Sequence, residues 1–313
     1  MNNSAPALID FDWDTFDPWR IQAVRHRLSD HPLLQPDQLV ALGKRFQGST
    51  RLFTFNNEAG ADANFDDVGR LYPNRKSAAD TLQGINDAKA WMLLRHVQDD
   101  PAYRGLVNLA MDPIQPPIER KDPGMHYRAG WIFVASPRTI TPFHIDRNHG
   151  ILLQVRGTKR VYVWDASDTD VCSERARDVF HARHDLALVK WDESFRERAH
   201  VFTLGPGMGV YMPITCPHMV ETTDEPSITI SLTYSTAATR RNAMRHVMND
   251  LLYRKGIKPI PVGKRPLVDT LTYATASALV AAHGVGSRPP ACPSLAHPSA
   301  YAVADCSTSR SAT

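Results

Sequence analysis

A series of short runs with a period of two, between about residues 131 and 234, most strongly limits the folds open to this chain. In such a run, alternate side chains point to opposite faces, which is the geometry of a β-strand. Glycine, proline or polar residues bound each run, and the runs are WIFVAS, ILLQVR, KRVYVW, HVFTL, GVYM and SITISLTY. Because helices do not alternate with these runs, we expect an antiparallel sandwich or barrel rather than a parallel, doubly wound sheet.

The chain before this segment has a mainly helical pattern. Residues 1–112 are expected to form a mainly helical region that packs on the core, with a helix starting near Asp17 and a long helix capped by Ser77. The apolar positions of the long helix are Leu82, Ile85, Ala88, Met92 and Leu93. Residues 51–55 are expected to form a short strand. The predicted architecture is therefore a mainly β core with flanking helices.

The remaining chain divides into a core, an insertion, a helical region and a tail. The core is assigned to 113–236, and the charged, irregular residues 165–199 are interpreted as an insertion between two strands. Residues 237–283 are expected to be helical, with basic residues around an apolar stripe made of Met244, Val247, Met248, Leu251 and Leu252. We favour packing of this stripe on its own domain or on a second copy over contact with a membrane or nucleic acid. Residues 284–313 are rich in Ala, Ser and Pro, which predicts a disordered tail.

Composition argues against several classes of protein. The net charge of +3 gives no case for nucleic-acid binding, and no helix-turn-helix pattern or concentrated basic domain is present. No apolar run approaches the ~18 residues of a membrane span, and the N-terminus lacks the pattern of a signal peptide. The 4 cysteines have no C-x-x-C spacing, which argues against a disulfide scaffold or a thiolate zinc site. We therefore expect a soluble cytoplasmic protein without a membrane or direct nucleic-acid partner.

One segment, TPFHIDRNHGILLQVRGTKRVYVW at 141–164, carries His144 and Asp146 two positions apart, on the same face of an expected strand. Two polar groups on a buried face are costly unless something satisfies them. An imidazole and a carboxylate that reach one point are two of the three ligands of the facial triad that holds non-haem iron(II). A third candidate, His218, follows the run GVYMP and two prolines that restrict the backbone. We therefore predict a metal site made of His144, Asp146 and His218.

The residues alone leave other interpretations of this motif open. With 13 histidines in the chain, an H-x-D match can arise by chance, and an ion pair with a nearby arginine would also explain Asp146. His218 on its own is compatible with a hydrogen-bonded core histidine. His181 and His184 have an i, i+3 spacing that can bind zinc, but no third ligand converges on them, so we favour a solvated helix face.

At these residues the chain resembles the cupin-like JmjC branch of the iron(II)- and 2-oxoglutarate-dependent oxygenases, most of all the asparaginyl-hydroxylase type and related bacterial cupin-like proteins. The resemblance covers roughly 131–234 and extends more loosely into HPLLQPDQLVAL and KAWMLLRHVQDDPAYRGL. It implies a double-stranded β-helix, the jelly-roll of cupins, in which His144, Asp146 and His218 bind iron(II).

The resemblance also implies a site for the co-substrate 2-oxoglutarate. Thr141, three residues before the first ligand, would contact it, and Lys159 would bind its distal carboxylate. A dicarboxylate needs a cation at its far end, which agrees with these roles. The alternative is that Lys159 is an exposed turn residue of the hairpin RGTKR, with Arg156 or Arg160 in its place.

The activity implied by the resemblance is hydroxylation of a protein, a peptide or a small molecule. The chain departs from relatives in two places. Gly150 stands where some relatives have an asparagine, and the stretch Ser231 to Thr233 stands where relatives often have asparagine and tryptophan. The substrate of the asparaginyl hydroxylases is therefore not carried over. Two other functions stay open: a cupin-type metalloenzyme without 2-oxoglutarate, and a non-enzymatic metal- or metabolite-sensing regulatory protein that acts through the C-terminal helix. Relatives also imply a homodimer through that helix.

Overall fold

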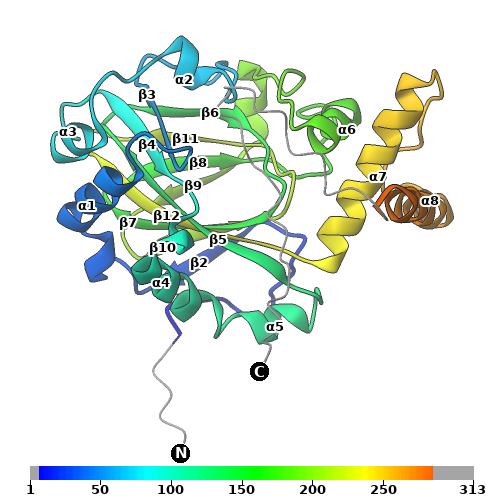
Figure 1. Cartoon of the computed structure of the whole chain (residues 1–313), viewed down its shortest axis with the longest axis horizontal. Coiled ribbons are helices and arrows are strands. Elements are labelled where there is room, and N and C mark those ends of the chain that lie inside the picture. The colour runs from blue at the N-terminus through cyan, green and yellow to red at the C-terminus, as the bar shows by residue number, and fades with distance from the viewer. Residues whose placement is uncertain (1–6, 285–313) are drawn as a thin grey trace, which may run out of the picture.

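The computed structural model of the protein describes residues 7–284, whose strands form two antiparallel sheets that face one another (Figure 1). The strands of the larger sheet are, in spatial order, β1 (Ile9–Asp10), β2 (Gln22–His26), β10 (Met208–Met212), β7 (His149–Arg156), β12 (Ser227–Ser235), β5 (His126–Ala135), β4 (Ala90–Leu94) and β3 (Leu52–Asn56). Those of the smaller sheet are β6 (Ile140–His144), β11 (His218–Thr222), β8 (Lys159–Val163) and β9 (His200–Leu204). From β5 onward the chain crosses between the sheets at nearly every connection, so the expected jelly-roll is confirmed.

The alternation along the strands separates two apolar layers. On β5, Ile132 and Val134 face the cluster shared with the N-terminal helices, whereas Trp131 and Ala135 belong to the cluster that includes residues of the smaller sheet. Helices cover the outer face of the larger sheet, and they are α1 (Pro36–Phe46), α3 (Ala78–Gln83), α4 (Pro101–Met111) and α5 (Gln115–Glu119). The short helix α2 (Val68–Leu71) and the 3-10 turns Pro32–Leu34 and Val97–Asp99 complete this half. The inner layer is the one that contains the site residues.

The N-terminal half departs from the sequence prediction in two places. Ser77 does cap a helix, accepting a hydrogen bond from the Asp80 amide, but that helix ends at Gln83 and the predicted long helix is wrong. Residues 90–94, AWMLL, instead form β4, which is buried over its whole length between β3 and β5. A continuous apolar run fits a buried strand as well as a helix, so the spacing of apolar residues could not distinguish the two at 90–94. The segment at Asp17 forms a turn and no helix.

Residues 1–112 are consequently not a separate helical layer. Their described part supplies β1 to β4 to the larger sheet, and its helices pack on the outer face of that sheet. The strand predicted at 51–55 is confirmed as β3. The division of the chain at 112 therefore cuts through a sheet that both parts build.

The insertion and the C-terminal helices lie beside the strands. The insertion falls between β8 and β9, as predicted, and contains α6 (Glu174–Arg183) and the 3-10 helix Glu193–Arg198. After β12 follow α7 (Ala237–Arg254) and α8 (Pro266–Gly284), which together are called the C-terminal arm. Figure 1 shows α6 between the strands and α7, with α8 on the far side of α7.

The apolar stripe predicted on α7 is divided by the fold. Met248 is buried and Leu251 and Leu252 are half-buried, whereas Val247 is 44% exposed. Within residues 7–284, none of the helices has both the length and the hydropathy that a membrane span requires. The tail predicted from 284 onward lies, apart from Gly284, outside the described residues.

Candidate metal centre

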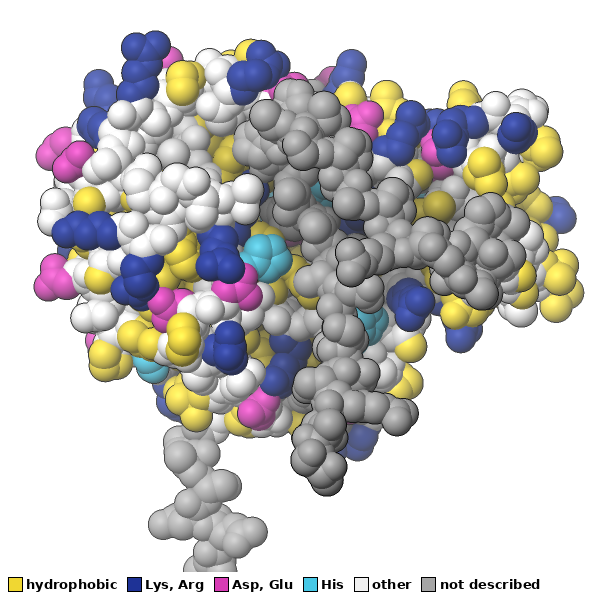
Figure 2. Space-filling view, viewed as in Figure 1, with side chains coloured by type: hydrophobic (Ala, Val, Ile, Leu, Met, Phe, Trp, Pro, Cys, Tyr) yellow, Lys and Arg dark blue, Asp and Glu magenta, His cyan; other side chains and the backbone are white. Residues whose placement is uncertain are grey.

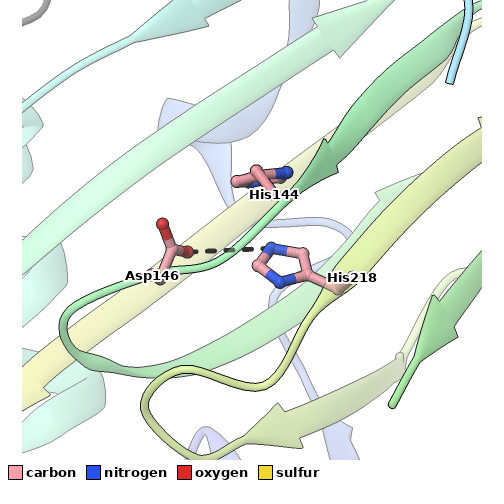
Figure 3. Close-up of side chains that lie close together, drawn as sticks. All are labelled: His144, Asp146 and His218. Atoms are coloured by element: carbon pink, nitrogen blue, oxygen red, sulfur yellow. Dashed lines mark ion pairs between the residues drawn. The ribbon is translucent and has the colours of Figure 1, made fainter. Parts of the chain in front are cut away.

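The three predicted ligands meet at one edge of the smaller sheet. His144 is the last residue of β6 and His218 is the first of β11, and the two are paired directly across neighbouring strands. Asp146 lies two residues beyond β6. One ligand atom from each residue lies within 4.8 Å of the others, and Nε2 of His218 is 3.7 Å from Oδ2 of Asp146 (Figure 3). The structure therefore brings His144, Asp146 and His218 together as predicted.

Backbone carbonyls orient both imidazoles. The Nδ1 atom of His144 lies 2.7 Å from the carbonyl oxygen of Pro142, and Nδ1 of His218 lies 3.0 Å from that of Cys216. Each Nδ1–H therefore donates to a carbonyl, which leaves Nε2 as a lone-pair donor. The backbone of Asp146 is held in the same region, because its carbonyl oxygen accepts a hydrogen bond from the Thr215 amide at 2.9 Å. Two neutral imidazoles and one carboxylate are the donor set that iron(II) takes in a facial triad, so these residues fit that ion.

The electrostatics of the site favour a bound cation. Burial lowers the pKa of His144 well below its usual value, and the nearby His218 lowers it further. Desolvation raises the pKa of Asp146, an effect that His218 opposes. A buried imidazole that stays neutral is ready to donate a lone pair, and a divalent ion beside Asp146 would offset the cost of its charge.

An aromatic wall supports the first ligand. The ring of Phe65 stacks on His144 with centroids 4.4 Å apart and planes 9° from parallel. Trp91 of β4 contacts Phe65 edge-on at 5.9 Å and also contacts Phe133 at 5.6 Å. Sequence reasoning missed both Phe65, which lies in a polar connection, and Trp91, which was assigned to a helix. No pattern in the sequence marks a loop phenylalanine as the neighbour of a ligand about 80 residues away.

Thr141 and Lys159 are both buried inside the jelly-roll. The Thr141 hydroxyl accepts a hydrogen bond from Trp91 Nε1 at 2.9 Å. Lys159, the first residue of β8, is 4% exposed and donates from Nζ to the Thr229 hydroxyl at 2.6 Å. The Thr229 hydroxyl donates in turn to Oε1 of Gln154 at 2.8 Å. The alternative that Lys159 is an exposed turn residue is wrong, because its side chain points into the protein interior.

Within the described residues, Lys159 has no ion-pair partner that balances its charge. Its ammonium group donates to the Thr229 hydroxyl, and burial lowers the pKa of that ammonium group to about 7. The two arginines considered as replacements, Arg156 and Arg160, are exposed. A buried lysine of this kind is either neutral or awaits an anion.

The competing histidine pair takes a different arrangement. His181 is in the last turn of α6 and is buried, so the expected solvated helix face is wrong. It stacks on His246 of α7 with centroids 4.9 Å apart, and His184 ends the helix in a left-handed conformation. Among the described residues, the set at His144 is the one cluster of three or more potential ligands that converges. The pair at His181 is therefore no candidate metal site.

Arg147, the arginine next to Asp146, bonds to backbone carbonyls of α6. Arg147 donates from Nη2 to the carbonyl oxygens of Phe180 and His181, at 2.6 and 3.1 Å. The interpretation that Asp146 serves only as an ion-pair partner of an arginine therefore receives no support from this contact.

Comparison with known proteins decides the family. Residues 9–240 match the model of the cupin-like domain. The chain belongs to the cupin-like family. This confirms the family expected from the sequence, and the cupin-like region ends shortly after the start of α7. A search of curated proteins found no match.

Solved structures with a similar chain path have low sequence identity to this cupin-like protein. YcfD from Escherichia coli is 14% identical, with 87% of this chain and 68% of that chain covered and a TM-score of 0.48. Another structure shows YcfD, described as a ribosomal oxygenase, in complex with cobalt and 2-oxoglutarate. It is 13% identical, with 88% of this chain and 68% of that chain covered and a TM-score of 0.44. The DMSP lyase DddQ from Ruegeria pomeroyi is 18% identical over 34% of this chain and 38% of that chain, with a TM-score of 0.23.

Proposed function

We propose that this cupin-like protein is an iron(II)- and 2-oxoglutarate-dependent oxygenase that hydroxylates its substrate. The support from the structure is the convergence of His144, Asp146 and His218, which offers a facial set of ligands and leaves the other positions around an ion open. When bound, iron(II) would supply the activation of dioxygen in this chemistry. The protein itself would hold 2-oxoglutarate and the substrate in place and keep water away from them.

The observation that carries the co-substrate assignment is the buried Lys159. Isolated buried cations are costly, and a carboxylate is the partner that offsets this cost best. Lys159 lies four residues along β8 from Val163, the residue paired with His218, which is on the order of 13 Å at the usual strand rise. A lysine side chain and a five-carbon dicarboxylate laid end to end cover such a distance. Thr141, on β6 three residues before His144, is the proposed hydroxyl contact.

Two residues position Lys159 for this task. Thr229 accepts the lysine hydrogen bond and Gln154 accepts from Thr229, so the ammonium group is held at a defined point in the interior. Both neighbours are neutral and fully buried. The free positive charge is therefore available to an incoming carboxylate rather than consumed by an internal ion pair.

The proposal is tested by adding iron(II) and then 2-oxoglutarate to the protein without oxygen and recording the visible spectrum. We expect the weak charge-transfer band of an iron–2-oxoglutarate chelate, which requires both components on one site. A folded protein that gives no band contradicts the proposal. A protein that binds iron(II) but whose turnover is indifferent to 2-oxoglutarate and to Lys159→Met would instead be a cupin enzyme without this co-substrate. Binding of metal without any turnover would favour a sensing role.

We also infer that two copies associate through the C-terminal arm. Large apolar side chains are exposed on the arm and on the connection between its two helices, and they are Val247 (44%), Tyr253 (53%), Ile257 (54%), Leu267 (82%) and Leu271 (68%). Figure 2 shows apolar and basic side chains together over the surface that α7 and α8 form. Several large apolar side chains exposed in one region are typical of an interface. Sedimentation of Leu271→Glu should show a monomer where the parent sediments as a dimer, and a monomeric parent would remove the inference.

A further inference from the structure

The residue that follows the carboxylate ligand connects the metal centre to the insertion. Arg147 lies within the connection from β6 to β7, residues 145–148, and its guanidinium group reaches the end of α6. It donates to the carbonyl oxygens of Phe180 and His181, at 2.6 and 3.1 Å, and lies 5.3 Å from the centroid of the Phe180 ring. The Phe180 carbonyl oxygen also accepts a hydrogen bond from the His184 amide at 2.8 Å, and the last carbonyls of a helix carry its negative partial charge. Arg147 therefore caps α6 from outside.

Other residues of this connection, and His149 at the start of β7, are tied to β10, to β12 and to the turn between β10 and β11. The amide of Thr215 donates to the carbonyl oxygen of Asp146 at 2.9 Å. The Ser235 hydroxyl donates to Oδ1 of Asn148 at 2.6 Å, and the His149 ring lies 2.8 Å from the Tyr211 hydroxyl. The backbone at Asp146 is thus held on one side by Thr215, in the turn between β10 and β11, and on the insertion side by the capping contact of Arg147. A carboxylate ligand needs such support, because its own χ angles are free to turn.

The arm holds α6 in its turn. Nδ1 of His246 on α7 lies 2.7 Å from Oδ1 of Asp178 on α6, and both side chains are buried. Asp250 of α7 is fully buried and pairs with Arg175 at 2.8 Å and Arg183 at 3.3 Å. These contacts fix the side of α6 that faces α7, as the arrangement in Figure 1 shows. The carbonyl oxygens that accept from Arg147 belong to α6. The arm, which holds α6, therefore also helps to hold the connection that contains Asp146 and Arg147.

We propose that Arg147 is a positioning residue for metal binding: it holds the Asp146 carboxylate in place by fixing the β6–β7 connection to α6, with α7 as the support of α6. The inference rests on the proposed metal site. It adds that contacts from α7 to α6, and from α6 to Arg147, help to hold the ligand Asp146. The competing explanation is that Arg147 stabilises the fold and leaves the metal affinity unchanged. The two explanations differ in whether affinity and stability change together.

The test is calorimetric titration of the full chain with Co(II), with thermal unfolding measured on the same samples. We expect Arg147→Met to weaken Co(II) binding by about tenfold, the lower end of the loss for a group bonded directly to a ligand, because Arg147 supports Asp146 through the backbone. Arg147→Gln should weaken it similarly, because an amide cannot bind two carbonyls in the same way as a guanidinium group. Asp250→Asn should weaken binding less, by a few-fold, because its effect passes through α6.

Arg177→Met is the matched control. Arg177 is a buried arginine of the same helix, and it bonds to Glu174 and to the carbonyl oxygen of Asp168, away from the β6–β7 connection. This variant should lower the unfolding temperature and leave Co(II) affinity at the parental value.

Each outcome has a distinct meaning. A parent that does not bind Co(II) removes the proposed metal site and the inference with it. A parent that binds, with Arg147→Met and Arg147→Gln at the same affinity, overturns the role of Arg147 alone. If Arg147→Met fails to fold, Arg147→Gln decides in the same way. An unchanged affinity in Asp250→Asn beside a weakened Arg147 variant removes the contribution of α7.

Discussion

Two buried histidine clusters lie within residues 7–284, and of these one has the geometry of a metal site. At the sheet edge, the rings of His144 and His218 are 4.1 Å apart with a carboxylate oxygen 3.7 Å from Nε2 of His218. Between α6 and α7, the rings of His181 and His246 are 4.9 Å apart, and the carboxylate of Asp178 bonds directly to His246 at 2.7 Å. The composition of the two clusters is nearly the same.

The difference lies in where the ring nitrogens point. At the sheet edge each Nδ1 is occupied by a carbonyl two residues earlier, so the Nε2 atoms and the carboxylate are directed at one volume. Between the helices the rings are stacked 7° from parallel, and neither nitrogen of His181 has a hydrogen-bond partner in the described part of the chain. Neighbouring strands with paired ligands create convergence, whereas stacked rings on crossing helices do not.

The largest expected effect separates the two clusters directly. His218→Ala should weaken Co(II) or iron(II) binding by more than about 100-fold, because loss of an outer partner of a ligand already costs 10- to 100-fold. His181→Leu, a buried histidine of the other cluster, should keep the parental affinity within a factor of about three. Calorimetric titration of both variants measures this. Equal losses in the two would contradict the assignment of the metal to the sheet edge.

The next effect concerns the co-substrate. Lys159→Met should weaken 2-oxoglutarate binding by roughly 10- to 100-fold, consistent with the ~1.5–3 kcal/mol of a hydrogen bond to a charged group. The metal affinity should stay at the parental value, because Lys159 makes no contact with the ligand set. Titration of the metal-loaded protein with 2-oxoglutarate measures the first affinity, and titration with metal alone measures the second. A parental affinity in Lys159→Met would mean that another group receives the carboxylate.

The affinity for 2-oxoglutarate should also depend on pH. Burial lowers the pKa of Lys159 to about 7 in the free protein, so the ammonium group loses its proton as the pH rises above that value. The carboxylate binds the charged form, and affinity should therefore fall above pH 7 by up to about tenfold per pH unit. Binding measured between pH 6.5 and 8.5 should show this fall in the parent and lose it in Lys159→Met. A flat profile in the parent would show that the lysine stays charged.

The smallest effect concerns stability and tests the second cluster alone. His181→Leu should raise the free energy of unfolding by about 1 kcal/mol, because two buried nitrogens without partners cost stability. Burial also lowers the pKa of His181 well below its usual value, with His246 as the next cause. The folded state thus stays neutral while the unfolded chain binds a proton, and the parent should lose stability as the pH falls below about 6.5. Denaturant unfolding at pH 7.5 and 5.5 should show a weaker pH dependence in the variant.

Sequence reasoning recovered the parts of the site that depend on local spacing. His144 and Asp146 share a face because they are two apart at the end of a strand, and the strand-rich core followed from the same period. His218 was identified through its place after a strand and two prolines, and the pairing of β6 with β11 supplies the reason that it meets His144. The roles of Thr141 and Lys159 came from a family resemblance. Both side chains are buried, and their functions stay predictions.

Contacts across long sequence distances could not be predicted in this way. β4 was assigned to a helix because a fully buried strand has no polar face to reveal its period. Phe65 reaches His144 from a loop, and the three residues before Gly150 each have a partner far away in the sequence. Arg147 caps α6, Asn148 accepts from Ser235, and His149 contacts Tyr211.

The sequence by itself determined which residues can act as ligands and that two of them lie on one face of a strand, because that geometry is set by neighbours in the chain. The tertiary structure decided which histidines converge, that Lys159 points inward, and that the insertion and the arm support the connection after Asp146. Those outcomes depend on strand register and helix packing between distant segments, which spacing along one chain does not contain.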